Sequence, residues 1–209
     1  MFFTISFYSL MIKHGYNSSW MFRGVSLDEF KAINAPLPFF WHWFLIWNVI
    51  SLYPLIDSVT KKYCEQCLLK INSRIVFWIT HFISLALFCI LLNSLMLLLV
   101  DIFWTDIAGE AIIVFILGQI IIVEVCLLIS NVVSLKIAFG LTVLFPILGI
   151  DNYITWLPAN FLMQIRVQEA GLDFSDVLGR ELLFLLCLFF GGWVICVRQQ
   201  YYSVNGGQR

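Results

Sequence analysis

The chain has 209 residues, of which 61% are hydrophobic and only 12% are charged. Soluble domains usually carry about 25% charged residues, so this composition excludes an ordinary soluble globular domain. The net charge of −1 says little about partners, but the charges lie almost entirely between apolar stretches. The polar segments are only loop-sized, and we predict one membrane domain covering residues 1–209.

The apolar stretches are long and continuous. A bilayer core about 30 Å thick needs roughly 20 apolar helical residues to cross it. Continuous rather than alternating apolar runs favour helices over the strands of a membrane barrel. We therefore predict an all-α, polytopic membrane helical bundle with five full transmembrane helices plus a short N-terminal apolar segment. The five predicted spans are Leu37–Ile56, Ile75–Val100, Ala111–Val133, Leu135–Ile150 and Leu182–Val197.

The N-terminal apolar segment and the fourth predicted span each differ from an ordinary transmembrane helix. Residues 1–13 are apolar but have no basic region and no small-residue cleavage site, so a secretory signal is not indicated. They are short for a span, and either an interfacial helix or the outer part of a tilted helix fits them. Pro146 lies near the end of the fourth stretch, where we expect it to break or kink a short helix.

The charges predict one orientation of the spans. Lysines and arginines of short loops favour the cytoplasmic side, and they concentrate in the link Asp57–Arg74, at Lys136 and after the last span. The turn at residues 101–110 and the segment Asp151–Arg180 are mainly acidic. We therefore predict a plasma-membrane protein with a cytoplasmic C-terminus and an external Asp151–Arg180 segment.

Glu124 is the one acid deep inside a predicted span. A charge there costs about 3 kcal/mol on insertion scales, so the side chain should face other helices or water, or be protonated. Asn131 is predicted to share its helix face, and Gln119 to sit off to the side. Two readings stay open, a residue that contacts substrate or a proton, and an interhelical hydrogen bond.

The link Asp57–Arg74 mixes basic and apolar residues. Tyr63, Cys67 and Lys70 fall at helical spacing, which predicts a short amphipathic helix. Such a helix can lie on the anionic inner leaflet or dock on a cytoplasmic partner. Cys64 and Cys67 form a CxxC pair, but no second ligand pair accompanies it.

The order of these parts resembles the permease subunits of ABC-2-type transporters, especially the small ones of Gram-positive peptide-export and bacteriocin-immunity systems. Three places carry the resemblance. The first is Pro54-Leu55-Ile56-Asp57-Ser58 with the basic link ending Asn72-Ser73-Arg74. The second is the external run from Trp156 to Arg166, and the third is the last span ending Arg198-Gln199-Gln200-Tyr201-Tyr202. The family has six helices, and residues 1–13 depart from it because they are too short for the usual first helix.

The resemblance implies transport of a hydrophobic or amphipathic peptide or a drug-like molecule. It implies pairing with a second permease subunit, as a homo- or heterodimer, and binding to separate ABC ATPase subunits. ATP and Mg would bind those partner chains, so we expect no cofactor, metal or catalytic residue in this chain, and no nucleic acid partner.

The resemblance also implies two functional segments beside the candidate pathway residues Glu124, Gln119 and Asn131. The external segment Trp156–Arg180 would form short helices that cap the exit route. The residues of the ATPase-coupling loop would be Lys61, Lys62, Glu65, Lys70, Asn72, Ser73 and Arg74. Those of the external gate loop would be Trp156, Pro158, Asn160 and Arg166.

Two other functional classes remain open on the residues alone. An accessory or immunity membrane protein that binds a toxin or another membrane protein would have the same hydropathy. A membrane-embedded enzyme would use either the Cys64/Cys67 pair or Glu124. A thiol enzyme that uses Cys64 and Cys67 is disfavoured because cytoplasmic thiols stay reduced. An enzyme that uses Glu124 is disfavoured because no other acid and no histidine lies at helical spacing from it.

Overall fold

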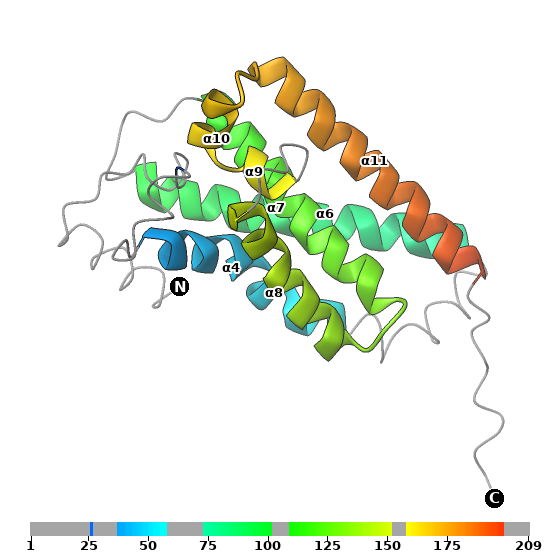
Figure 1. The fold of residues 1–209 in the computed structure, drawn as a ribbon. Helices are drawn as coiled ribbons and strands as arrows, with labels where there is room; N and C mark the ends of the chain where they lie inside the picture. Colours follow the sequence, from blue (N-terminus) through cyan, green and yellow to red (C-terminus); the bar gives the residue numbers. More distant parts are fainter. Residues whose placement is uncertain (1–25, 27–36, 58–72, 102–108, 152–157, 199–209) are drawn as a thin grey trace, which may run out of the picture.

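The computed structural model describes Ser26 and residues 37–57, 73–101, 109–151 and 158–198 (Figure 1). These residues form helices and turns, with no strand among them. The helices are α4 (Leu37–Asp57), α6 (Arg74–Asp101), α7 (Gly109–Ser130), α8 (Leu135–Asp151), α9 (Pro158–Phe161), α10 (Gln164–Glu169) and α11 (Phe174–Arg198). The all-α class is therefore confirmed for the described part of the chain.

Helix α7 is the central element of the bundle. It packs against α4, α6, α8, α9 and α11, and every residue from Gly118 to Leu127 is buried. A helix that is apolar on all sides has no polar face to turn outward and is buried by its neighbours. The sequence of α7 is of this kind, which explains why the other long helices surround it (Figure 1).

Three helices are long and apolar enough to cross a membrane, α6, α7 and α11. The apolar parts of α4 and α8 among the described residues are shorter, at Leu45–Asp57 and Leu135–Phe145. Apolar side chains also cover the outside of α6 and α11, where Leu91 and Leu183 are each 63% exposed. A continuous apolar exterior suits lipid rather than water, so these features indicate a membrane protein.

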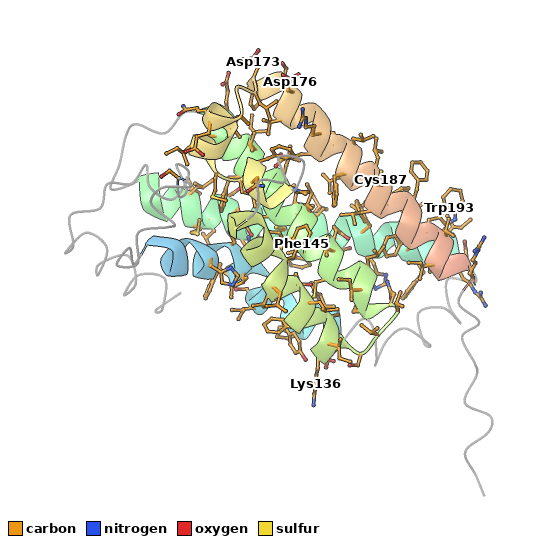
Figure 2. The ribbon with its side chains drawn as sticks, in the orientation of Figure 1. Lys136, Phe145, Asp173, Asp176, Cys187 and Trp193 are labelled. Atoms are coloured by element: carbon orange, nitrogen blue, oxygen red, sulfur yellow. The ribbon has the colours of Figure 1, made fainter. Side chains whose placement is uncertain are left out.

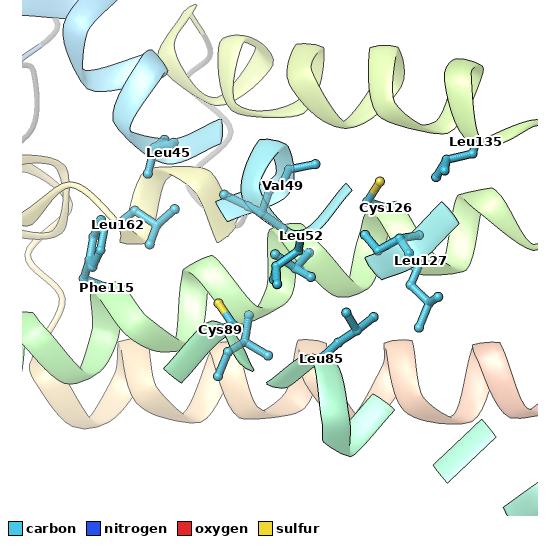
Figure 3. Close-up of a cluster of buried hydrophobic side chains, with 14 of the residues drawn as sticks. Leu45, Val49, Leu52, Leu85, Cys89, Phe115, Cys126, Leu127, Leu135 and Leu162 are labelled. Carbon is cyan, nitrogen blue, oxygen red and sulfur yellow. The ribbon is translucent and has the colours of Figure 1, made fainter. Parts of the chain in front are cut away.

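The core lies where α4, α6 and α8 meet α7 (Figure 3). Leu45, Val49 and Leu52 of α4 and Leu85 of α6 pack there against residues of α7 such as Phe115. On the other side of α7, helix α11 packs through Leu188 against Ile121 and Val125. These contacts bury the part of α7 from Gly118 to Leu127 on all sides.

Close packing of α11 on α6 depends on one glycine. The ring of Trp78 from α6 occupies the place where a side chain at Gly192 would lie. Trp78 also donates a hydrogen bond from Nε1 to the carbonyl oxygen of Phe189 at 3.0 Å. The sequence Gly191-Gly192 predicts close approach or a kink, and close approach is what Gly192 provides.

The two ends of the bundle carry opposite charges. Arg74, Lys136 and Arg198 lie at helix ends on one side, because α6 and α8 begin there and α11 ends there (Figure 1). The Sγ of Cys196 lies 3.6 Å from the carbonyl oxygen of Arg74, which joins two of these ends directly. Figure 2 shows Lys136 at the opposite end from Asp173 and Asp176. We call these the basic end and the acidic end.

The acidic segment before the last span is more helical than a loop. Short helices were expected there, and α9 and α10 form. A Schellman motif then ends α10: Gly171 has φ 63°, and Leu172 donates to the carbonyl of Val167 at 3.1 Å. Asp173 accepts the first helical hydrogen bonds of α11 through its carbonyl oxygen.

Three predicted boundaries are corrected. The last helix begins at Phe174 rather than Leu182, because hydropathy detects apolar residues and not the turn that starts the helix. Helix α7 ends at Ser130, so Asn131 to Val133 form a turn instead of extending the span. Pro146 does not break α8, which continues to Asp151.

Candidate functional site

A cluster of three amide side chains lies inside the bundle, one on each of three helices. Asn48 of α4 donates from Nδ2 to Asn93 Oδ1 of α6 at 3.1 Å and to Gln119 Oε1 of α7 at 3.0 Å. Asn93 in turn donates to the carbonyl oxygen of Cys89 at 2.8 Å. We call Asn48, Asn93 and Gln119 the amide cluster. It links segments that lie 45 and 71 residues apart in the chain.

The amide cluster is buried, and among the described residues it is incompletely paired. Gln119 is 0% exposed, and Asn48 and Asn93 are 2% exposed each. The Oδ1 of Asn48 and the Nε2 of Gln119 have no hydrogen-bond partner. Most buried polar atoms in proteins have at least one partner, so this acceptor and this donor are exceptions among the described residues.

Glu124 lies on the same central helix, five residues nearer the basic end than Gln119, or about 7.5 Å along the axis. Its side chain is 1% exposed, and neither carboxyl oxygen has a hydrogen-bond partner. Glu124 and Gln119 are therefore both buried polar groups of α7, and Gln119 is the one that pairs with another helix.

Most other polar side chains of the spans pair with their own helix. Thr80, His81 and Thr142 each hydrogen-bond the backbone carbonyl four residues earlier, at 2.7, 2.7 and 2.8 Å. Such bonds satisfy one polar group of the side chain within its own helix. The amide cluster differs because its three side chains join three helices.

Glu181 is a second buried acid that the sequence reasoning missed. It lies on α11, is 0% exposed, and has no partner on either carboxyl oxygen. The signal was present in the sequence, because Val177, Glu181, Leu188 and Cys196 recur at helical spacing and form the buried face of α11. It was overlooked because the span was predicted to begin one residue later, at Leu182.

The predicted pathway residues are only partly brought together. Gln119 and Glu124 are both in the buried part of α7, whereas Asn131 lies in the turn that follows this helix and is only half-buried. Its backbone N–H donates to the carbonyl oxygen of Leu127 at 3.2 Å. This i→i−4 bond continues the helical pattern by one residue past Ser130, and the shared face of Asn131 and Glu124 stays a prediction.

The predicted coupling loop falls mostly outside the described residues. Lys61, Lys62, Glu65, Lys70 and Asn72 belong to this group, as does the predicted amphipathic helix. Ser73 precedes α6, and its Oγ accepts a hydrogen bond from the N–H of Val76 at 3.4 Å, as a helix N-cap does. Arg74 is the first residue of α6.

The predicted external gate is a packed segment where it is described. Pro158 begins α9 and is buried, and Asn160 in the same helix is 7% exposed. Helix α9 packs against α7 and α8. Arg166 belongs to α10, but its side chain lies outside the described residues, as does all of Trp156.

The described part of the chain contains no cluster of side chains suited to bind a metal ion. No group of three His, Cys, Asp or Glu side chains there could hold a metal ion. Cys64 and Cys67 lie outside the described residues, so the thiol prediction is untested. The candidate site is therefore a set of buried amide and carboxyl groups.

No protein-family model, curated protein or solved structure matches this chain. The assignment of a function consequently depends on the arrangement of its own residues. Two features matter most for that assignment, the buried polar groups on α4, α6, α7 and α11, and the separation of charge between the two ends of the bundle.

Proposed function

We propose that the chain is the membrane-spanning permease subunit of an ATP-driven ABC transporter, powered by ATPase subunits on separate chains. In this proposal α4, α6, α7, α8 and α11 are five full spans, and the protein works with a second permease subunit in the plasma membrane. The cargo is a hydrophobic or amphipathic peptide or a drug-like molecule. The chain carries no ATPase site of its own.

The observation that carries the proposal is the separation of charge between the two ends. Arg74, Lys136 and Arg198 occupy the basic end, whereas Asp173 and Asp176 occupy the other. Basic residues favour the cytoplasmic side of a membrane. The basic end would therefore face the cytoplasm, where ATPase subunits are found.

The positions of the helix ends support a coupling element at the basic end. Helix α4 ends at Asp57 and α6 begins at Arg74, both at the basic end (Figure 1). The residues between them include three lysines, Lys61, Lys62 and Lys70. A basic link of this size that is tethered to two helices of the bundle is suited to pass movement from an ATPase to α4 and α6.

The interior supports a cargo that is largely apolar but carries some polar groups. Apolar side chains fill most of the space around α7, while Asn48 and Gln119 retain an unpaired acceptor and an unpaired donor. A peptide or drug-like molecule could exchange hydrogen bonds with these groups when the helices separate. An inorganic ion or a sugar would require many more polar side chains than this interior contains in its described part.

The test is co-purification after co-expression with the neighbouring genes of the same operon or locus. The full chain is purified in mild detergent, and a nucleotide-binding ATPase should accompany it. Charge reversal by Lys61→Glu, Lys62→Glu and Arg74→Glu should abolish recovery of the ATPase. The matched control reverses charge at the acidic end with Asp173→Lys and Asp176→Lys, and it should leave recovery unchanged.

Two results would count against the proposal. The first is a pure, folded chain that never brings an ATPase with it, which would favour an accessory or immunity protein that acts without ATP. The second is an ATPase that binds equally well to the wild type and to the charge-reversed basic-end variant. This result would show that the link between Asp57 and Arg74 is not the ATPase-coupling element.

A further inference from the structure

The carboxyl group of Glu181 is enclosed by three helices near the acidic end. One turn earlier on the same face of α11, Val177 packs with Val114 of α7 and Phe161 of α9. Two turns later, Leu188 packs with residues of α7. Glu181 lies between these two contacts and is 0% exposed. Its side chain therefore points into the interface of α11 with α7 and α9.

Among the described side chains, the charged and titratable groups near this interface do not pair with Glu181. Helix α9 has the sequence PANF and contains none. On α7, Glu110 is exposed at the start of the helix, and Glu124 is buried about four turns further along, nearer the basic end. On α6, His81 hydrogen-bonds the carbonyl oxygen of Phe77.

The neighbours of Glu181 along the chain also face elsewhere. Arg180 is exposed and its guanidinium lies 5.6 Å from the ring centroid of Phe161. Asp173 and Asp176 are exposed, and so is Glu169 of α10. The carboxyl group of Glu181 consequently lies among these residues without a hydrogen-bond partner on either oxygen.

We propose that Glu181 is a proton-binding site of the bundle that exchanges its proton with water at the acidic end. A carboxylate buried without a counter-charge or a donor is strongly disfavoured, whereas the neutral acid is tolerated. A proton is the ligand that needs no additional space, which suits a side chain enclosed by packed helices. On binding, an O–H bond forms at the carboxylate; on release, that bond breaks and the proton passes to water.

The position of Glu181 supports exchange with the acidic end. It lies eight residues after Asp173, which corresponds to about 12 Å along the helix axis. The exposed carboxylates of Asp173 and Asp176 surround the start of α11. Two exposed acids at one end of a helix raise the local concentration of cations, protons included. Ionised Glu181 would favour partial separation of α11 from α9, because water must then reach the carboxylate.

Infrared spectroscopy of the full chain in lipid nanodiscs tests this proposal without any cargo or ATPase. The measured quantity is the carbonyl stretching band of protonated carboxylic acids, recorded during a titration from acid to alkaline pH. We expect a band assigned to Glu181 that is present at neutral pH and is lost reversibly at alkaline pH. It should be missing in Glu181→Gln and unchanged in the matched control Asp176→Asn, an exposed acid on the same helix.

Glu124 must be distinguished from Glu181, so Glu124→Gln identifies its band separately. If Glu181→Gln does not assemble, Glu181→Leu supplies the same comparison with an apolar side chain. The proposal is overturned if the neutral-pH band is the same in wild type and either Glu181 variant. It is also overturned if the Glu181 band fails to titrate at all, because the proton would then be permanent and not exchanged. A positive result in a chain that recruits no ATPase would leave the proton site intact while contradicting the transporter proposal.

Discussion

Replacing Gly192 by alanine is the sharpest test of how α11 docks on α6. The new Cβ would overlap the six-membered ring of Trp78, whose side chain is 3% exposed. To make room, the ring must move and weaken its 3.0 Å hydrogen bond to the carbonyl oxygen of Phe189. Overpacking costs about 1–3 kcal/mol, and an interhelical hydrogen bond in a membrane contributes about 0.6 kcal/mol.

Gly191→Ala is the matched control, because it makes the same chemical change one residue away. There the nearest atom is Cδ1 of Leu128 at 3.9 Å, an ordinary contact. Both variants gain similar helix propensity, so this gain cancels in their comparison. We expect Gly192→Ala to have a free energy of unfolding about 2–3 kcal/mol lower than that of Gly191→Ala.

Reversible unfolding in mixed detergent micelles, followed by circular dichroism, measures this difference. The deficit of Gly192→Ala should shrink in a Trp78→Phe background, because phenylalanine lacks the indole atoms that the new Cβ meets. Equal stabilities of the two glycine variants would refute the reasoning. If the stability deficit of Gly192→Ala stays the same in the Trp78→Phe background, its cause is not the contact between residue 192 and the indole ring.

Three further predictions concern the polar groups and the charged ends. In a double-mutant cycle, Asn48→Ala and Gln119→Ala should couple by about 0.6 kcal/mol, the mean for interhelical hydrogen bonds in membranes, when unfolding is measured in the same micelles. Glu124→Gln should assemble normally, because a neutral amide needs no counter-charge, whereas Glu124→Lys should lower the yield of folded protein on size-exclusion chromatography. In a cysteine-free background, Lys136→Cys and Asp176→Cys should react with a membrane-impermeant maleimide from opposite sides of the membrane.

Each of these expectations has a contrary outcome. Additive effects of Asn48→Ala and Gln119→Ala would show that their hydrogen bond contributes nothing measurable. Equal yields of Glu124→Gln and Glu124→Lys would mean that the side chain can reach water. Labelling of both cysteines from the same side would contradict the assignment of Lys136 and Asp176 to opposite membrane faces.

The hydropathy of the chain predicted its long helices well. Leu37–Ile56 became α4 and Ile75–Val100 became α6, each within about one residue at either end. Such runs form helices in lipid because the backbone must satisfy its hydrogen bonds within the segment. Boundaries were predicted less well where polar residues belong to a helix, as at the start of α11, where Asp173 provides the first turn's acceptor.

The polar site was predicted in part. Glu124 stood out because an acid within an apolar run is rare, and Gln119 was noted beside it. Asn48 and Asn93 could not be joined from the sequence, since nothing local connects two asparagines 45 positions apart. Glu181 was missed because a hydropathy boundary placed it at the edge of a span instead of on a buried helix face.

The sequence by itself therefore determined that the described part of the chain is helical and belongs to a membrane protein, where most of its long helices lie, and that Arg74, Lys136 and Arg198 mark helix ends. These properties are local, because hydropathy and charge act on each segment separately. Only the tertiary structure decided that α7 is central, that Asn48, Asn93 and Gln119 meet, and that Glu181 faces inward. These properties depend on which helix faces are in contact, and that choice is made by packing between segments far apart in the chain, as Trp78 against Gly192 illustrates.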